Sequence, residues 1–165
     1  RLVNPDQRVL RLLAGLDAPA GAEGPDLWPS QRDVAEAVGL TRAQVTDVVE
    51  RARARWSKKK AITAVRDDVA RLLEQAGGVA TREELARALI RIRGTTAVSE
   101  AEQQRGAGAV LWAALEVEGA RETSCRYRLQ RGERLLVVVG TASDGASAAE
   151  SLADPAAVRA WVEQL

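Results

Sequence analysis

The chain contains no histidine, no methionine and no phenylalanine, and Cys125 is its single cysteine. One cysteine excludes a disulfide within the chain and is typical of a reducing compartment, so we expect a cytoplasmic protein. Without histidine, a zinc site would depend on carboxylates, which seldom bind zinc alone. Nucleophilic catalysis with a histidine base is excluded as well. These absences predict a chain with no metal, no cofactor and no enzymatic activity of its own.

Aromatic residues make up only 3% of the chain, whereas 46% of it is hydrophobic and 28% is charged. That balance is typical of a globular protein and not of a disordered one. The core must therefore consist of aliphatic side chains, with four tryptophans as large local fillers. Its alanine-rich composition favours helix. No apolar run reaches the roughly 18 residues that a membrane-spanning helix needs, so we expect no membrane contact.

Charge is nearly balanced overall, with a formal net charge of +1, but its distribution is uneven. Seven basic and two acidic residues lie between Thr41 and Lys60, whereas four acidic residues and one basic residue lie between Asp144 and Leu165. Local positive charge attracts a polyanion even when the net charge is small. The first segment is therefore the candidate for contact with nucleic acid. The chain begins at Arg1 and not at methionine, which predicts a piece of a longer protein.

Three helices are predicted in the first 57 residues. Asn4 and Pro5 are typical of a helix start, and Ser30 and Thr41 are N-cap residues that precede two further helices. The stretch between the first and second helices is rich in proline and glycine, as loops are. We expect one tri-helical unit over residues 1–57.

The residues that follow predict a second unit with a different element order. Helices are expected over residues 62–76, from 82 to about 92 and from 99 to about 118, with a two-residue strand before the second of them. Two strand-like segments, 123–129 and 134–139, are joined by a short turn, which is typical of a hairpin. This is the order of a winged helix, which we expect over residues 61–140, with a linker and a terminal helix over 141–165. The predicted fold class is thus mainly α, a helix-turn-helix module followed by a winged-helix module with a small β-hairpin.

Residues 30–49 have the spacing of a helix-turn-helix. Ala35 falls where the two helices would cross, since only a small side chain allows close approach. Gly39, four residues later, falls in the turn, where it can adopt a positive φ. Leu40 would fill the gap behind the turn, and valines on both helices would face inward. The other positions of the second helix are then free to meet a duplex.

Outward side chains of that second helix would enter the major groove, where arginine can address guanine and glutamine can address adenine. Cations at the helix end would bind phosphates, which supply affinity and register but no sequence choice. The predicted DNA-binding residues are Thr41, Arg42, Gln44, Thr46, Asp47, Arg51, Arg53, Arg55, Lys58, Lys59 and Lys60. Two alternatives are an ordinary helical hairpin with a solvated basic end and a helix-turn-helix that is used only for protein contact.

The hairpin of the second unit offers a further set of cations, whereas its third helix does not. That helix starts at Ser99 with two glutamates in its first turn, and these would repel phosphate. Hairpin arginines could contact a phosphate or a minor groove, or could simply solvate an exposed sheet edge. The candidate wing contacts are Arg126, Arg128, Arg131 and Arg134.

Two family resemblances add to these patterns. Trp28-Pro29-Ser30-Gln31, Thr41-Arg42 and the arginine-rich run that ends at Trp56 resemble region 4 of bacterial sigma-70-type factors, in which such a helix pair binds double-stranded DNA. No sigma region 2 accompanies them, so the resemblance does not imply an intact sigma factor.

The second resemblance covers most of the chain. The segment 27–31, the arginine-rich helix, Arg66-Asp67-Asp68 and the segment 74–79 are similar to the C-terminal part of the serine/threonine kinases of Pgl/BREX phage-defence systems. The resemblance implies a kinase domain upstream, because no glycine-rich phosphate loop and no His-Arg-Asp or Asp-Phe-Gly stretch occurs in this chain.

The expected function is therefore DNA binding by a region of a larger bacterial protein that recruits or regulates an attached effector, such as a phage-defence kinase. The expected partners are double-stranded DNA and other protein subunits of a defence system. Two alternatives remain open. One is a protein-interaction scaffold that uses the winged helix without DNA contact. The other is a regulatory appendage of a kinase that never meets DNA.

Overall fold

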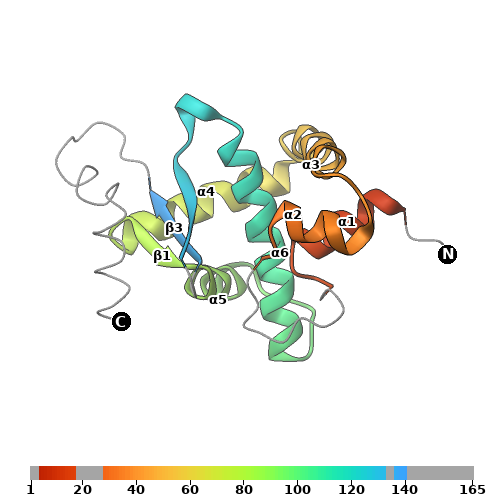
Figure 1. The fold of residues 1–165 in the computed structure, drawn as a ribbon. Coiled ribbons are helices and arrows are strands. Elements are labelled where there is room, and N and C mark those ends of the chain that lie inside the picture. The colour runs from red at the N-terminus through yellow and green to blue at the C-terminus, as the bar shows by residue number, and fades with distance from the viewer. Residues whose placement is uncertain (1–3, 18–27, 133–135, 141–165) are drawn as a thin grey trace.

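The computed structural model describes residues 4–17, 28–132 and 136–140, and within these residues the fold is mainly helical (Figure 1). The expected linker and terminal helix, residues 141–165, lie outside the described residues. The helices are α1 (Pro5–Leu13), α2 (Gln31–Val38), α3 (Arg42–Trp56), α4 (Lys60–Gln75), α5 (Arg82–Arg93) and α6 (Glu100–Gly119). The strands are β1 (Val79–Thr81), β2 (Tyr127–Arg131) and β3 (Leu136–Gly140), and a short 3-10 turn, Glu122–Ser124, precedes β2.

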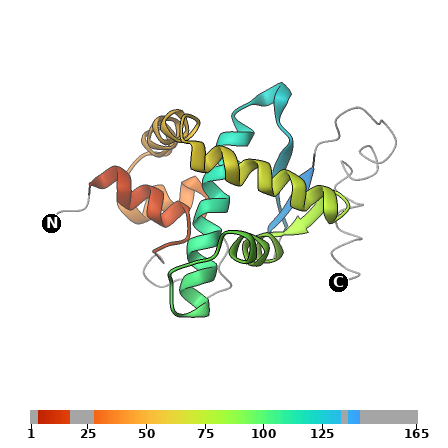
Figure 2. The same ribbon diagram turned by 180° about the vertical axis from the view of Figure 1, so that it is seen from behind.

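Helix α6 is the centre of the arrangement. Helices α1, α2 and α3 lie on one side of it, and α4, α5 and the sheet lie on the other (Figures 1 and 2). It contacts α3, α4, α5 and β2. Its run from Leu111 to Leu115 is buried without interruption, as expected for a helix that is packed on several sides.

The strands form an antiparallel sheet with the order β1-β3-β2. Strand β2 pairs with β3 in a register that places Tyr127 opposite Gly140, so the predicted hairpin is confirmed. Strand β1 adds to the other edge of β3, with Val79 opposite Val139. The sheet thus links the hairpin to the segment between α4 and α5, which contains β1.

The first hairpin strand begins later than the sequence predicts. The sequence favours a strand from residue 123, but Glu122–Ser124 form a 3-10 turn and the strand starts at Tyr127. Glu122 has a φ of 42°, and the backbone amide of Ser124 donates to the carbonyl of Arg121. A residue with positive φ cannot continue an extended strand, so the chain turns first. Cys125 and Tyr127 are both buried, so this segment faces the core with alternate residues.

One hydrophobic core runs through both halves of the described chain. It combines Leu13 and Val49 from the first three helices with Val69, Leu111 and Tyr127 from the later elements. Aliphatic side chains and alanine make up most of it, as the composition predicts.

Aromatic contacts and one buried arginine fasten the two halves to each other. Trp56, at the end of α3, meets Trp112 of α6 edge to face, with ring centroids 5.7 Å apart. Arg82, the first residue of α5, is buried with its guanidinium carbon 5.0 Å from the centroid of the Trp28 ring. Gly108 of α6 makes room for this arginine, since a Cβ there would lie 2.7 Å from Arg82 Nη2. Gly108 is therefore a site of close approach between α6 and Arg82.

Candidate nucleic-acid interface

Helices α2 and α3 begin and end at the residues that the sequence predicts as their boundaries. The Ser30 hydroxyl caps α2 by accepting a hydrogen bond from the backbone amide of Asp33, and Thr41 caps α3 through the amide of Gln44. In return, the Asp33 carboxylate accepts from the Ser30 hydroxyl and amide, and these bonds lower the pKa of Asp33 below its ordinary value. Gly39 adopts a φ of 71° between the two helices. These local signals set the angle at which α3 leaves α2.

The contact between α2 and α3 is apolar at its centre and polar at its rim. Val34 and Ala35 of α2 are buried, as is Val45 of α3. At the rim, the Thr46 hydroxyl donates to Gln31 Oε1 at 2.8 Å and is half-buried. The sequence predicts that Thr46 faces a DNA base. Its hydroxyl proton is instead used within the helix pair.

The opposite side of α3 is exposed along its first two turns. Thr41, Arg42, Gln44 and Asp47 are all exposed. Arg42 also lines a cavity that residues of α1, α6 and β2 share. The carbonyl of the Gln44 side chain accepts from the amide of Thr41 at 2.9 Å. The nitrogen of the Gln44 side chain therefore remains available to contact a partner.

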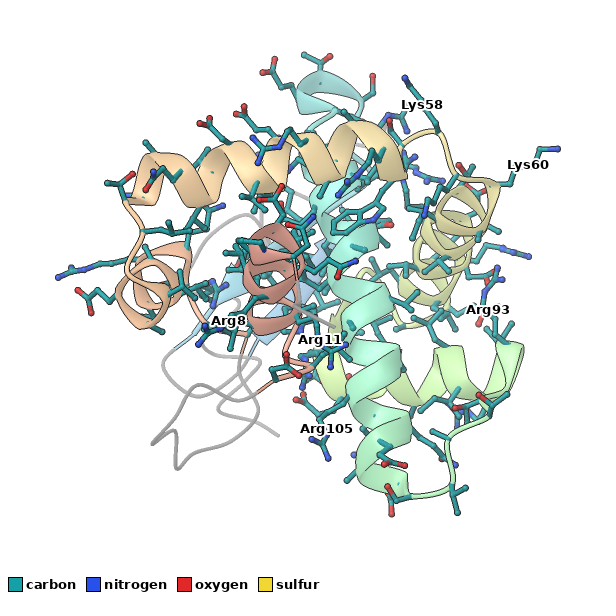
Figure 3. All side chains as sticks on the ribbon, turned by 90° about the vertical axis from the view of Figure 1, so that its right-hand side faces the viewer. Arg8, Arg11, Lys58, Lys60, Arg93 and Arg105 are labelled. Carbon is teal, nitrogen blue, oxygen red and sulfur yellow. The ribbon has the colours of Figure 1, made fainter. Side chains whose placement is uncertain are left out.

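The predicted phosphate-binding cations divide into two groups. Arg51 and Arg53 pair within the protein: Arg51 Nη2 lies 2.9 Å from Asp6 Oδ2 of α1, and Arg53 Nε lies 2.8 Å from Glu116 Oε2 of α6. The other four are exposed and have no ion pair among the described residues, and these are Arg55, Lys58, Lys59 and Lys60. Figure 3 shows Lys58 and Lys60 extending away from the joint between α3 and α4.

Helix α4 begins at this cationic joint without a side-chain cap. Lys59 is its N-cap residue and makes no capping hydrogen bond. The first backbone amides of a helix otherwise need a partner, and a helix N-terminus favours negative charge. The end of α3 and the start of α4 therefore form a cationic corner, defined by Arg55, Lys58, Lys59 and Lys60, beside amides that lack a side-chain cap.

The predicted wing arginines are only partly free. Arg126 donates to Glu118 and Asp67, and Arg131 Nη1 donates to the carbonyl of Trp28 at 2.7 Å. Arg128 is exposed, and Arg134 lies outside the described residues. Arg131 and Arg42 line the same cavity, of about 340 Å³, beside the start of α2. The hairpin therefore leans back onto the first three helices and brings one cation near the exposed face of α3.

A buried carboxylate on α6 was not found from the sequence. Glu118 is fully buried, and it accepts from Arg66 Nε at 2.9 Å and from the backbone amide of Arg126 at 2.8 Å. Burial acts to raise its pKa, but the hydrogen bonds from Arg126 and Arg66 prevail and lower that pKa below its ordinary value. The same contacts raise the pKa of Arg126 further. Only the folded chain brings these residues together, so no local signal could have revealed them.

The described residues can be examined for metal sites and for membrane-spanning helices. No group of three or more acidic or cysteine side chains there could hold a metal ion. Among the described helices, none combines the length and the apolar character that crossing a bilayer requires.

The structure thus defines a mainly helical chain with an exposed helix, α3, that ends in a cluster of cations. Comparison with known proteins adds a relative, the "Probable kinase PglW" of Streptomyces coelicolor, which is 36% identical over 111 residues. The match covers 67% of this chain and 7% of the relative, so the chain spans a small part of the protein that it resembles. It supports the resemblance to the Pgl kinases, and the small share accords with a non-catalytic part. No family model and no solved structure matches the chain.

Proposed function

We propose that α2 and α3 are a helix-turn-helix, related to sigma-70 region 4, that binds double-stranded DNA. The observation that carries the proposal is the exposure of α3, where Arg42 and Gln44 meet solvent at the first turn and the cationic corner lies at the other end of the same helix. Arg42 would contact guanine, and Gln44 would donate to a base from its side-chain nitrogen, because its carbonyl accepts from Thr41. The cationic corner would hold phosphates and set the register.

The contacts seen in the structure narrow the set of residues proposed to meet DNA. Arg53 pairs with Glu116 in a half-buried contact, Arg51 pairs with Asp6 at the surface, and Thr46 bonds to α2, so the proposal gives these three a smaller part than the other cations. Thr41 and Asp47 remain at the edge of the set, where they are exposed. Arg128 of the hairpin remains a candidate phosphate contact.

The second unit, α4 to β3, would be a winged helix that supports the first. Its third helix, α6, presents buried aliphatic residues and begins with Glu100 and Glu102, so it is unsuited to a major groove. We propose that residues 1–57 and 61–140 are two structural units that follow each other in the chain. Because one core runs through both units, we expect them to unfold in a single transition.

The relative gives this binding unit a context. We infer that the chain is a region of a larger bacterial protein and that DNA binding recruits or regulates an attached effector, such as a phage-defence kinase. Other subunits of such a system would be its protein partners. In the full-length parent, loss of DNA binding through α3 should leave the activity of the effector on a free peptide substrate intact.

Salt-dependent binding to a random-sequence duplex, measured by fluorescence anisotropy, tests the proposal. The triple variant R42A/R55A/K58A should bind more weakly, and the slope of log affinity against log salt should fall by about 0.9 for each phosphate that the variant no longer neutralises. The control R87A/R91A/R105A removes the same charge from exposed positions of α5 and α6 and should leave the slope unchanged. Absence of salt-dependent binding, or an equal weakening in both variants, would reject the proposal.

A protein-interaction scaffold is the second candidate, and one observation favours it. Ile92 and Val98, at the connection between α5 and α6, are 55% and 94% exposed. Apolar side chains held in solvent can mark a protein contact. If this contact were the function, I92S/V98S would abolish capture of partner subunits, and the wild-type chain would not bind the duplex at low salt.

A further inference from the structure

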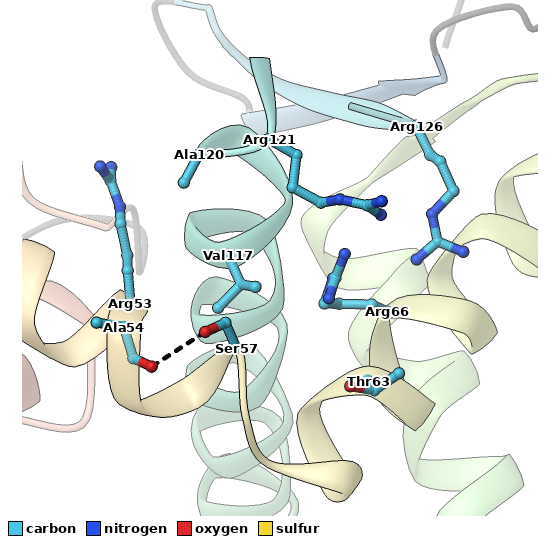
Figure 4. Close-up of a pocket in the computed structure, with 9 residues that line it drawn as sticks. All are labelled: Arg53, Ala54, Ser57, Thr63, Arg66, Val117, Ala120, Arg121 and Arg126. Carbon is cyan, nitrogen blue, oxygen red and sulfur yellow. Dashed lines mark hydrogen bonds between the residues drawn. The ribbon is translucent and has the colours of Figure 1, made fainter. Parts of the chain in front are cut away.

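A second cationic site lies on the side of α3 that faces the rest of the protein. It is a cavity of about 590 Å³ between the end of α3, the start of α4, the end of α6 and the segment before β2 (Figure 4). Four of its lining residues are arginines, Arg53, Arg66, Arg121 and Arg126. Arg53 turns away toward Glu116, whereas the guanidinium groups of the other three converge (Figure 4).

Glu118 lies beneath these three guanidinium groups and orders two of them. Arg66 Nε is 2.9 Å from Glu118 Oε2, and Arg126 Nε is 3.2 Å from Glu118 Oε1. Arg121 Nη1 stands farther off, at 3.8 Å. Arg126 also reaches Asp67 Oδ1, at 2.8 Å, on the exposed side of α4. The carboxylates thus fix the direction of the arginines without using all their donors.

The cavity keeps both positive charge and open hydrogen-bond donors. Three guanidinium groups face two carboxylates, which leaves one positive charge in excess. A guanidinium carries five N–H donors. Among the described residues, the Arg66 side chain makes only its bond to Glu118, and the Arg121 side chain makes no hydrogen bond. Arg66 is 7% exposed as a whole residue, and it lines the cavity.

These properties define the chemistry of a ligand. Arginine forks match the oxygens of a phosphate, and several forks together favour a group with more than one negative charge. A phosphate monoester carries a charge of about −1.5 to −2 at neutral pH, whereas a diester carries one. A nucleotide would also need a surface for its base, but the cavity wall offers only the small apolar side chains of Ala54, Val117 and Ala120.

We propose that this arginine cavity binds the phosphate of a phosphorylated serine or threonine on a protein segment. Arg121 would close on the phosphate from the exposed rim, and Arg66 and Arg126 would hold it from the inner side. The site is separate from the exposed face of α3, so it does not depend on DNA binding. Phosphorylation of a partner would then control its attachment to this region.

Isothermal titration with a short alanine peptide that carries one phosphoserine tests the proposal, with its unphosphorylated form as reference. The phosphopeptide should bind, and the reference should bind at least tenfold more weakly. R121A should weaken the phosphopeptide about tenfold, because it removes one charge-assisted fork. R121K should lie between the two, since lysine keeps the charge but not the fork. Arg121 is 45% exposed at its side chain, so these variants should fold, which circular dichroism checks.

R105A is the matched control, because it removes an exposed arginine from the other end of α6 and should not change binding (Figure 3). Equal binding of the phosphorylated and unphosphorylated peptides would overturn the proposal, as would an equal weakening in R121A and R105A. In that event the arginines would serve only Glu118 and the negative ends of α3 and α6. Inorganic phosphate and adenosine monophosphate form two further arms. Tighter binding of either one would overturn the protein-bound source of the phosphate.

Discussion

Helices α3 and α6 each follow two other helices in their half of the chain, yet they have opposite surroundings. Helix α3 buries one stripe, made of Val45, Val48, Val49 and Ala52, and leaves its other side in solvent. Helix α6 is buried over a continuous run from Leu111 to Leu115, and α4, α5 and the sheet flank it. The place of a helix in the element order therefore does not decide whether the helix is free to bind a partner. What matters is which side remains uncovered.

The charges of the two helices follow the same division. The first turn of α3 has no acidic residue, whereas α6 has Glu100 and Glu102 in its first turn. At its other end, α6 carries Glu116 and Glu118, which pair with arginines of α3 and α4. Helix α6 thus contributes carboxylates to the interior, and α3 presents cations to the outside. The comparison predicts that substitutions on α6 change stability and that substitutions on the outer side of α3 change binding.

The largest effect is expected at Glu118. E118A would leave Arg66 buried without its counter-charge, and breaking a buried ion pair in this way costs about 3–5 kcal/mol. Urea unfolding at neutral pH measures the decrease in stability. E50A, at an exposed position of α3 with no ion pair among the described residues, should stay within about 0.5 kcal/mol of wild type. Equal destabilisation of the two variants would contradict the division between the helices.

Acid sharpens the same test. Because the pKa of Glu118 is lower in the folded chain than in the unfolded chain, protonation of this carboxylate favours unfolding. Its contribution is complete above the ordinary glutamate pKa of about 4.3 and declines as the pH falls through the folded pKa. Below about pH 4, E118Q should therefore lose stability less steeply than wild type, by up to about 1.4 kcal/mol per pH unit. Parallel slopes would show that Glu118 does not titrate in this way.

Two glycines of α6 test how tightly this helix is packed. In G108A, the new Cβ would push Arg82 off the Trp28 ring, and overpacking of this kind costs about 1–3 kcal/mol. In G106A, the new Cβ meets no atom within 4 Å, so the higher helix propensity of alanine should stabilise the protein by up to about 1 kcal/mol. Thermal unfolding of both variants measures the contrast. A stabilising G108A would show that Arg82 moves without cost.

Arg53 and Arg55 of α3 are close in the sequence, but we expect the first to contribute to stability and the second to DNA binding. R53A removes the half-buried pair with Glu116 and should cost about 1–2 kcal/mol of stability, between the values for exposed and buried pairs. R55A should cost almost no stability, but it should lower the salt dependence of duplex binding by about 0.9 in slope. Urea unfolding measures the stability of both variants, and fluorescence anisotropy measures the salt dependence of their duplex binding. A reversal would place Arg53 at the duplex and Arg55 in the packing.

Local signals account for what could be predicted here. The caps at Ser30 and Thr41 and the turn at Gly39 involve partners a few residues away, so the sequence reveals them. The pair between Arg53 and Glu116 spans 63 positions and the pair between Arg66 and Glu118 spans 52, and neither leaves a local pattern. The cationic run therefore looks uniform in the sequence, although half of its arginines pair with acidic residues of other helices.

The smallest expected effect compares the first residues of the two helices. Thr41 caps α3 through the amide of Gln44, and Ser99 caps α6 through the amide of Glu102. T41A and S99A should each cost about 1 kcal/mol, the usual contribution of such a cap. Only T41A should also weaken duplex binding, because it loosens the first turn of α3, from which Arg42 and Gln44 project. Unfolding and anisotropy on both variants, with T41S as the variant that keeps the cap, measure this. If S99A weakened duplex binding as much as T41A, the proposed interface would have to extend to α6, whose first turn is acidic.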